Sequence, residues 1–159
     1  MILVADSSAL ICLAVCESLD LLELLFSEVK VPRAVFAEVS KKSKREADTL
    51  ANYLADKIID VETDENIIIR EGTIEIGELE AMTLYKQIKA DRLLLDDGRA
   101  RKIAGINGIK IIGSLGVLLL GKEKGYIKEI KSKIELIKES DIFLSKDLIS
   151  SVLKLAGEE

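Results

Sequence analysis

The sequence predicts an α/β fold with a central, mostly parallel sheet. Residues 2–5 and 93–95 are short, continuous apolar runs, and residues 109–112 form a third run that only Lys110 interrupts. Such runs are typical of strands buried on both faces. Segments with helical spacing of apolar residues lie between these runs, and strands that alternate with helices are joined by right-handed crossovers. Such crossovers place the carboxyl ends of the strands along one edge of the sheet, where ligands of parallel α/β folds bind.

Local signals place the remaining elements in chain order. Pro32 suits the first turn of a helix because it has no amide hydrogen to donate. Serine caps are predicted for three helices, at Ser7, Ser18 and Ser145. A further strand is expected at residues 29–31, residues 58–61 are predicted to be a strand or an extended connection, and residues 64–70 are ambiguous. The predicted helices cover residues 8–16, 19–26, 32–41, 45–56, 78–88, 102–106, 115–120, 128–138 and 146–155.

Length and composition indicate one globular domain. The chain has 159 residues, of which 48% are hydrophobic and 32% charged, and this is enough to bury a core. We expect a single domain over residues 1–159, with residues 126–159 as a C-terminal helical extension. No apolar run reaches the length of a membrane span and the start does not resemble a signal peptide, so we expect a cytoplasmic protein without a membrane partner.

The chain contains no histidine, which removes Ser-His-Asp and Cys-His catalysis together with zinc sites made by cysteine and histidine. Its two cysteines, Cys12 and Cys16, lie four residues apart in an apolar helical segment. We interpret them as small buried hydrophobic residues rather than as a metal or redox pair. A general base or a metal ligand must therefore be aspartate or glutamate.

Acidic side chains follow two of the predicted strands. Asp6 ends the first apolar run, and Asp96 and Asp97 end the run at residues 93–95. Glu38 and Glu80 reach the same edge from predicted helices, and Ser114 follows the strand at residues 109–112. Clustered carboxylates repel one another unless a cation lies among them, and oxygen ligands select Mg²⁺ or Mn²⁺ over zinc. Such ions activate water against phosphodiesters, so phosphoryl-ester hydrolysis is the favoured reaction.

Each of these features also has an ordinary structural explanation. Glu78 and Glu80 lie in the first turn of a predicted helix, where the helix dipole favours acids. The sequence Asp96-Asp97-Gly98 is also typical of a turn. A basic cluster after residue 40 is either a solvated helix end or a rim that contacts phosphates, and the net charge of −5 argues against non-specific binding of nucleic acid. Its members are Lys41, Lys42, Lys44 and Arg45.

Five short motifs together resemble a PIN domain. They are Asp6-Ser7-Ser8, VFAEV at residues 35–39 with Glu38, Gly77-Glu78-Leu79-Glu80-Ala81, Leu95-Asp96-Asp97 with Arg99 to Arg101, and Gly113-Ser114-Leu115-Gly116-Val117. Each motif is weak alone, but their order and spacing are specific. The chain is similar to the prokaryotic PIN-like group of predicted nucleic-acid-binding proteins, relatives of toxin-type PIN ribonucleases, over roughly residues 1–120.

This resemblance implies a three-layer α/β/α fold with a central, mostly parallel sheet, and Mg²⁺- or Mn²⁺-dependent cleavage of RNA. The family's helix-start acid follows a glycine by three positions, which selects Glu80 over Glu78. Ala100 fits the family pattern after Asp97, which favours Asp97 over Asp96. The catalytic and metal-binding acids implied are Asp6, Glu38, Glu80 and Asp97, with Asp96 as a further metal ligand. Supporting roles go to Ser7, Glu78 and Ser114, and RNA contacts to Lys41, Lys42, Lys44, Arg45, Arg99 and Arg101.

The implied partners are an RNA substrate and a small antitoxin-like protein, and the apolar faces of the early and last helices suggest a homodimer. The main alternative is a PIN-like module that binds RNA or protein without catalysis. A haloacid-dehalogenase-like phosphatase is disfavoured because Ser8 stands where that class needs a second aspartate. A response-receiver domain is disfavoured because the acid pair comes late in the chain.

Overall fold

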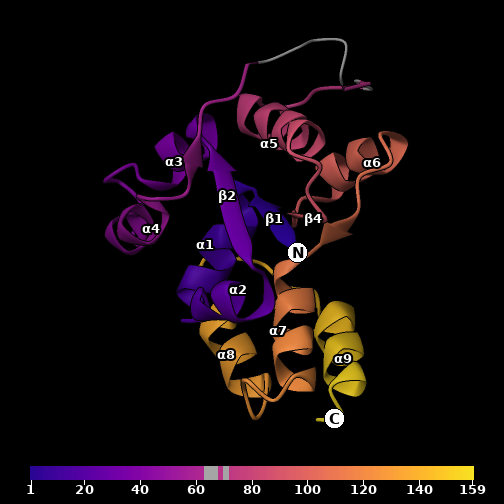
Figure 1. Ribbon diagram of the computed structural model, residues 1–159. Coiled ribbons are helices and arrows are strands. Elements are labelled where there is room, and N and C mark those ends of the chain that lie inside the picture. The colour runs from indigo at the N-terminus through magenta and orange to yellow at the C-terminus, as the bar shows by residue number, and fades with distance from the viewer. Residues whose placement is uncertain (63–67, 70–71) are drawn as a thin grey trace.

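The computed structural model describes residues 1–62, 68–69 and 72–159, and its centre is a five-stranded sheet in the order β3-β2-β1-β4-β5. Every pairing in this sheet is parallel (Figure 1). The predicted α/β class is therefore confirmed, and the sheet is entirely parallel. The strands are β1 (Ile2–Ala5), β2 (Glu28–Pro32), β3 (Ile58–Ile59), β4 (Arg92–Leu94) and β5 (Ile111–Ile112).

At least one helix lies between every two consecutive strands, and the helices form the layers on both sides of the sheet. They are α1 (Ser7–Val15), α2 (Asp20–Leu25), α3 (Arg33–Val39), α4 (Ala47–Leu54), α5 (Ile76–Gln87), α6 (Gly98–Ile106), α7 (Ser114–Glu123), α8 (Lys131–Lys138) and α9 (Lys146–Leu155). Among the described residues, no helix is both long and apolar enough to cross a membrane.

The alternation of side chains along β1 assigns the two faces of the sheet. Leu3 and Ala5 belong to one apolar cluster, together with residues of α1, α2, α4 and α7. Val4 points the opposite way, because successive side chains of a strand alternate, and it belongs to a second cluster formed with α5 and α6. Two packed helical layers thus enclose the sheet, which confirms the three-layer α/β/α architecture.

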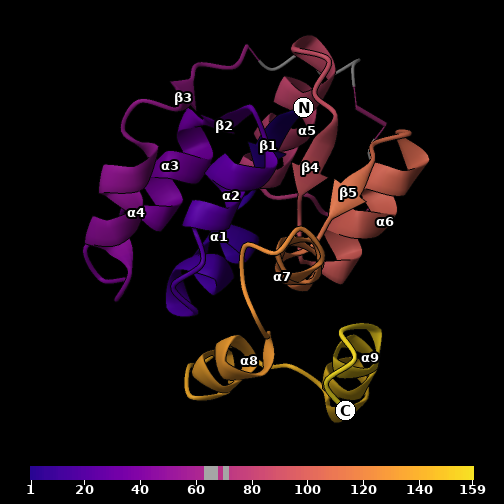
Figure 2. The same cartoon turned by 60° about the horizontal axis from the view of Figure 1, so that its bottom comes forward.

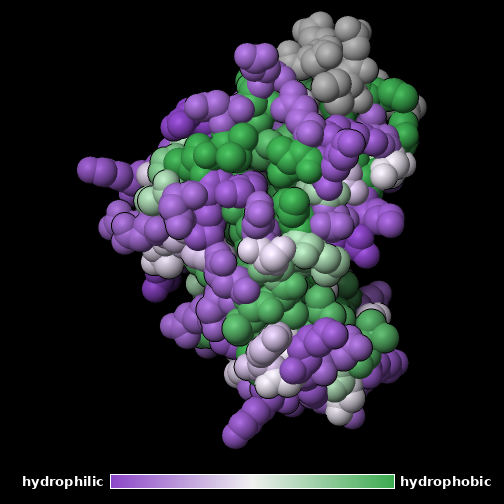
Figure 3. All heavy atoms as spheres, viewed as in Figure 1, coloured by the Kyte–Doolittle hydropathy of each residue, from purple (hydrophilic) through white to green (hydrophobic). Residues whose placement is uncertain are grey.

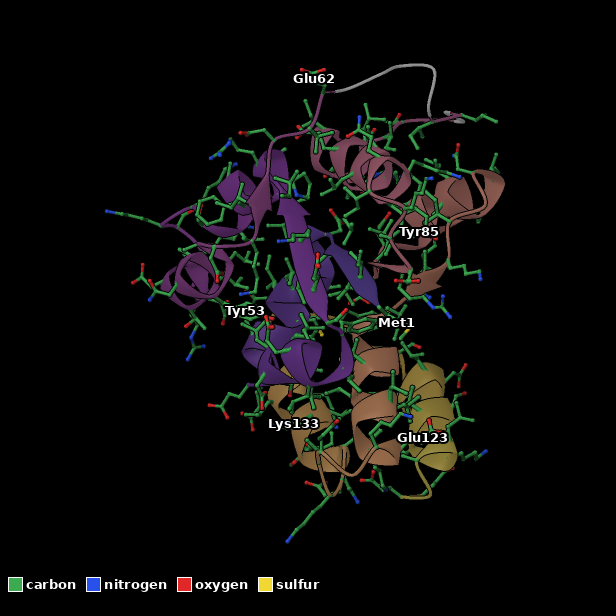
Figure 4. The ribbon with its side chains drawn as sticks, in the orientation of Figure 1. Met1, Tyr53, Glu62, Tyr85, Glu123 and Lys133 are labelled. Carbon is green, nitrogen blue, oxygen red and sulfur yellow. The ribbon has the colours of Figure 1, made fainter. Side chains whose placement is uncertain are left out.

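The C-terminal helices pack on the first of these clusters. Ile130, Ile134 and Ile137 of the α8 region and Val152 of α9 are buried members of it. Figure 1 shows α7 between α8 and α9, and in Figure 2 the connection that joins α8 to α9 passes below α7. Lys133 of α8, labelled in Figure 4, donates a hydrogen bond to the carbonyl of Glu17 at the end of α1 (3.3 Å).

Helix ends differ most from the sequence predictions. Ser7 is the first residue of α1, and Asp6 is its N-cap. Ser18 caps no helix, because its hydroxyl donates to the carbonyl of Cys16 (2.9 Å) and α2 follows Leu19. Pro32 ends β2 in extended conformation and precedes α3. Ser145 does cap α9, since its Oγ accepts from the amide of Leu148 (3.1 Å).

Several predicted elements are shorter or longer in the structure, and the types agree. The helix expected over 45–56 is α4, the strand or extended connection expected over 58–61 is β3, and the helix expected from residue 102 is α6, which begins at Gly98. Asp97 starts α6 early because its side chain caps the helix. Part of the ambiguous segment 64–70 lies outside the described residues.

Candidate active site

Asp6 lies at the carboxyl end of the central strand, where the chain turns from β1 into α1. Its amide donates to the carbonyl of Leu94 on β4 (3.0 Å), and its carbonyl accepts from the amide of Leu10 (3.3 Å). These bonds hold the residue between two strands and a helix start. Its side chain is only 4% exposed, so a carboxyl group is buried at the edge where parallel sheets bind ligands.

Burial is the main reason that the pKa of Asp6 is raised to about 7. An amide hydrogen bond from Ser7 opposes the shift, while the negative charges of Glu78, Glu38 and Glu75 add to it, in that order. Near neutral pH this group can therefore hold or release a proton. A cation beside it would favour the charged form.

Glu38 and Gly77 complete the surroundings of Asp6. The Glu38 Oε2 atom on α3 accepts a hydrogen bond from Ser7 Oγ (2.7 Å). Gly77, in the first turn of α5, has no side chain, and a Cβ there would lie 3.4 Å from Glu38 Oε2 and 4.0 Å from Asp6 Oδ1. The structure thus brings Asp6, Ser7 and Glu38 together, as the sequence predicted, and a glycine lets α5 approach them.

Glu78 is more deeply placed than the sequence suggested. It is 6% exposed and forms a capping box with Glu75, whose amide donates to Glu78 Oε2 (3.1 Å). Its Oε1 lies 3.5 Å from Arg99 Nη2. Burial raises the pKa of Glu78, against the lowering effects of the Glu75 amide and the Arg99 charge. The supporting role predicted for this residue therefore understates its electrostatic link to Asp6.

Glu80 is half-buried on α5 and is not among the charges that dominate the pKa of Asp6. It follows Gly77 by three positions, so both residues leave the helix on a similar side. Glu80 therefore stays in the candidate set beside Glu78. The sequence predicts only a supporting role for Glu78. The capping box with Glu75 also explains an acid at this position, and Glu75, three residues earlier in the sequence, is the signal for that box.

Asp96 and Asp97 are neighbours in sequence with different partners. Asp96 accepts from the amide and the hydroxyl of Ser114, both at 2.7 Å, and so ties the end of β4 to the start of α7. Asp97 Oδ2 accepts from the amide of Ala100 (2.9 Å) and lies 3.8 Å from Arg99 Nε. Asp97 is the more exposed of the two, and its charge acts on Glu78. Arg99 therefore lies near the carboxylates of Glu78 and Asp97.

The chemistry of these donors fits a hard divalent cation, because they are carboxylate and hydroxyl oxygens. The positions of these side chains in the structure do not yet form a metal site. Within residues 1–62, 68–69 and 72–159, no three acidic side chains are already grouped closely enough to hold a metal ion. Glu38, Glu78 and Asp96 instead have protein partners in Ser7, Arg99 and Ser114. Binding an ion among them would require these side chains to exchange partners.

A family model described as a PIN domain matches residues 2–158. The chain belongs to the PIN domain family. The predicted resemblance is thereby confirmed, and the match also spans α8 and α9. The fold of a PIN domain is nuclease-like, and its members are generally hydrolases that use divalent metals. A comparison with curated proteins found no match, and neither did one with solved structures.

The basic residues predicted to contact RNA are spread over this PIN domain. Arg99 lies among the acids, and the Arg101 Nε atom donates to the carbonyl of Leu95 (2.9 Å). Lys41 and Lys42 are exposed in the turn after α3. Lys44 and Arg45 line a groove of about 1030 Å³ between α1, α4 and α8. That groove also carries the acids Glu17, Asp20, Glu46, Glu139 and Asp141.

Proposed function

We propose that this PIN domain is a metal-dependent ribonuclease. The observation that carries the proposal is the buried Asp6 carboxyl at the carboxyl edge of a parallel sheet. Burial raises its pKa to about 7, and the negative charges of Glu78 and Glu38 add to this shift. Buried acids with perturbed pKa values cluster at functional sites. Family membership supports phosphodiester hydrolysis as the reaction class, and RNA is the substrate we infer.

Mg²⁺ or Mn²⁺ is the cofactor we infer, and Asp6, Glu38, Glu80 and Asp97 are the residues that would hold it, joined by Glu78. Asp96, which the resemblance adds as a further ligand, accepts from Ser114 through both oxygens, so we do not assign it to the ion. The ion would supply Lewis-acid stabilisation of the phosphoryl group and a water of lowered pKa. Asp6 would then be ionised, because the cation favours its charged form. Ser7 keeps Glu38 turned toward Asp6 through the 2.7 Å hydrogen bond.

Arg99 is the residue of this site best suited to contact a phosphate. Its side chain is about half exposed and lies near both Glu78 (3.5 Å) and Asp97 (3.8 Å). A guanidinium group can leave carboxylate partners for a phosphate, which it binds with two parallel hydrogen bonds. Once a cation neutralises the acids, Arg99 is free to contact the RNA backbone. Lys41 and Lys42 would extend this contact.

A second candidate function is binding of RNA or protein without cleavage. It is favoured by the acidic side chains, which within the described residues are not grouped for a metal ion and have protein partners. Under either function, the proposed partners are RNA, a small antitoxin-like protein and a second copy of the chain. Size-exclusion chromatography with light scattering tests the homodimer directly.

The decisive experiment measures cleavage of labelled single-stranded and hairpin RNA in EDTA, Mg²⁺ and Mn²⁺. Wild type is compared with Asp6→Asn and Asp97→Asn, and with Asp48→Asn as a matched control, since Asp48 is an exposed acid in the first turn of α4. We expect metal-dependent cleavage in wild type and control. Both site variants should lose more than the roughly 10- to 100-fold that is typical of residues that only orient a ligand.

Three results would count against this assignment. Cleavage that persists in EDTA would exclude the metal, and equal activity in all variants would exclude these acids. RNA that binds without cleavage under every condition would favour the binding module. A melting temperature within the range of the control would show that the loss of cleavage in a site variant is not a loss of fold.

A further inference from the structure

A cavity of about 720 Å³ opens beside Asp96, next to the candidate acids. Its walls are the end of β5, the start of α7, one side of α1, residues 142–144 of the connection between α8 and α9, and Leu148 of α9. This volume is in the range of pockets that hold small organic groups, roughly 300–1,000 Å³. Most of its lining is apolar, and its polar groups gather at the Asp96 end.

Phe143 is the unusual residue of this lining. Its side chain is 85% exposed, although its neighbours Ile142 and Leu144 pack against the apolar core. The chain contains three phenylalanines and no tryptophan, so a large exposed aromatic side chain is rare in this protein. Phe143 lines the cavity and is exposed, so its ring is accessible to a ligand.

The lining of the cavity also offers hydrogen-bonding groups, at Asp96, Ser114 and Arg101. Asp96 accepts one hydrogen bond on each oxygen from Ser114, and each carboxylate oxygen has a further lone pair. Arg101 uses Nε for the carbonyl of Leu95. Its terminal nitrogen atom lies so close to Gly113 that a Cβ there would overlap it. The flat guanidinium group is therefore held against the backbone at the cavity wall.

The floor on the α1 side is uncharged. Cys12 lines the cavity, and burial raises the pKa of its thiol to about 12, so the group stays neutral. Ile111, Ile112 and Leu115 supply apolar surface. A ligand for this cavity needs an apolar, planar body and a polar edge. A nucleobase has both.

We propose that this cavity is a nucleobase-binding subsite, in which an unpaired base of single-stranded RNA stacks on Phe143 and presents its edge to Asp96 and Arg101. The inference rests on the proposed ribonuclease function, because Asp96 adjoins Asp97 and the cavity opens at the same edge of the sheet. The subsite would bind a nucleotide next to the cleaved phosphate. It would therefore favour unpaired RNA over duplex RNA.

A tryptophan reporter tests the stacking directly. Phe143→Trp introduces the chain's single tryptophan, and Tyr126→Trp places a matched one in the connection before α8, at a residue that is also exposed. The probe is short single-stranded oligoadenylate in EDTA. We expect it to quench the fluorescence of Phe143→Trp, whereas the same strand in a duplex and inorganic polyphosphate should not. The Tyr126→Trp signal should stay unchanged.

Affinity gives a second readout. Phe143→Ala should weaken oligoadenylate binding by about tenfold, and Phe143→Tyr should keep most of it, because stacking needs an aromatic ring. Equal affinity of Phe143→Ala and wild type would overturn the subsite, as would equal quenching by polyphosphate. A blue-shifted Phe143→Trp spectrum that depends on protein concentration without RNA would assign the surface to self-association instead.

The two proposals can fail separately. RNA cleavage that Phe143→Ala performs as fast as wild type would leave the nuclease standing and remove the subsite. Quenching by oligoadenylate together with no cleavage under any metal condition would keep the subsite and remove the nuclease. Because Phe143 is exposed, its substitution should leave the melting temperature of the protein unchanged.

Discussion

The Asp6 carboxyl links the candidate site to folding stability through its raised pKa of about 7, against an ordinary value of 3.8. Between about pH 4 and pH 7 the folded protein keeps this proton, whereas the unfolded chain has released it. The free energy of unfolding should therefore fall as the pH rises through this window, by up to about 4 kcal/mol. Asp6→Asn should remove this slope and be more stable than wild type above about pH 7.

Urea unfolding at about pH 5 and about pH 8 measures this effect. Asp48→Asn is again the control and should keep the wild-type slope. Mn²⁺ should stabilise wild type at the higher pH and leave Asp6→Asn unaffected, since the variant has lost a ligand. An unchanged slope in Asp6→Asn would mean that another group titrates in this window.

The close packing around Gly113 predicts a second effect on stability at the residue scale. A Cβ at this position would overlap Arg101 Nη2 and lie 3.1 Å from Asp96 Oδ1. Gly113→Ala should therefore displace the guanidinium group and destabilise the protein by about 1–3 kcal/mol. Gly105→Ala is a matched control inside α6, where nothing lies within 4 Å, and it should be neutral or stabilising. Equal urea midpoints for the two variants would contradict this packing argument.

The sequence predicted Asp6, Glu38 and the acids after β4 because each follows or faces a recognisable apolar element. It could not predict their partners. Ser7 meets Glu38 across 31 residues and Ser114 meets Asp96 across 18, and such pairs depend on how the helices pack. The choices between Glu78 and Glu80, and between Asp96 and Asp97, remain predictions for the same reason.

At the scale of elements, Glu158 fastens the C-terminal tail to the start of α8. Its carboxylate accepts from the amides of Ile130 (2.9 Å) and Lys131 (3.1 Å) and from Lys122 Nζ (2.9 Å). Burial alone would raise the pKa of Glu158, but these donors outweigh it and lower the pKa below 4.5. The stabilisation is therefore present above about pH 4.5 and is lost as the pH falls through the lowered pKa.

Glu158→Gln should lower the free energy of unfolding by about 1–3 kcal/mol at neutral pH, because it replaces charge-assisted hydrogen bonds. Glu135→Gln is the control: Glu135 forms an exposed pair with Lys138, and such pairs contribute little. Thermal melting at neutral pH compares the two. Equal melting temperatures would show that the tail is held by its apolar contacts alone.

Element types were predictable from apolar periodicity, but element ends were not. A serine before an apolar run is a cap only where its hydroxyl can reach the helix amides. Ser145 does so at α9, whereas Ser18 donates backward to Cys16. Asp97 caps α6 and moves its start to Gly98, so a residue assigned to chemistry also has a structural role.

For the whole molecule, a net charge of −5 makes RNA binding depend on local cations. The hydropathy view in Figure 3 shows hydrophilic side chains over much of one face and hydrophobic ones gathered across its middle.

If Lys41 and Lys42 each neutralise a phosphate, Lys41→Ala with Lys42→Ala should reduce the salt slope of single-stranded RNA binding by about 1.4. Lys128→Ala with Lys131→Ala removes the same charge and should leave the slope unchanged.

Fluorescence anisotropy at several salt concentrations measures both double variants. If the double variant at Lys41 and Lys42 binds RNA with the same salt slope as wild type, these lysines do not contact phosphates and belong to a solvated helix end. Lys44 and Arg45 are weaker candidates as phosphate contacts, because five acids line the groove that they share.

The fold class was predictable from the whole chain because buried parallel strands are continuous apolar runs. The order of strands in the sheet was not, since hydrophobicity does not say which runs become neighbours. The PIN domain model matches residues 2–158, so the short motifs correctly predicted the family of the chain.

The central position of β1 also affects how the chain folds during synthesis. β1 is synthesised before both of its neighbours. β2 follows soon after it, but the other neighbour is β4, and the amide of Ile2 bonds to Asp91 across 89 residues. At a synthesis rate of about 5–20 residues per second, β4 follows β2 after on the order of 3 to 12 seconds. During this time the edge of β1 that faces β4 is unpaired. An unpaired strand edge invites aggregation. We therefore expect the yield of native protein to depend on chaperones that cover this edge until β4 arrives.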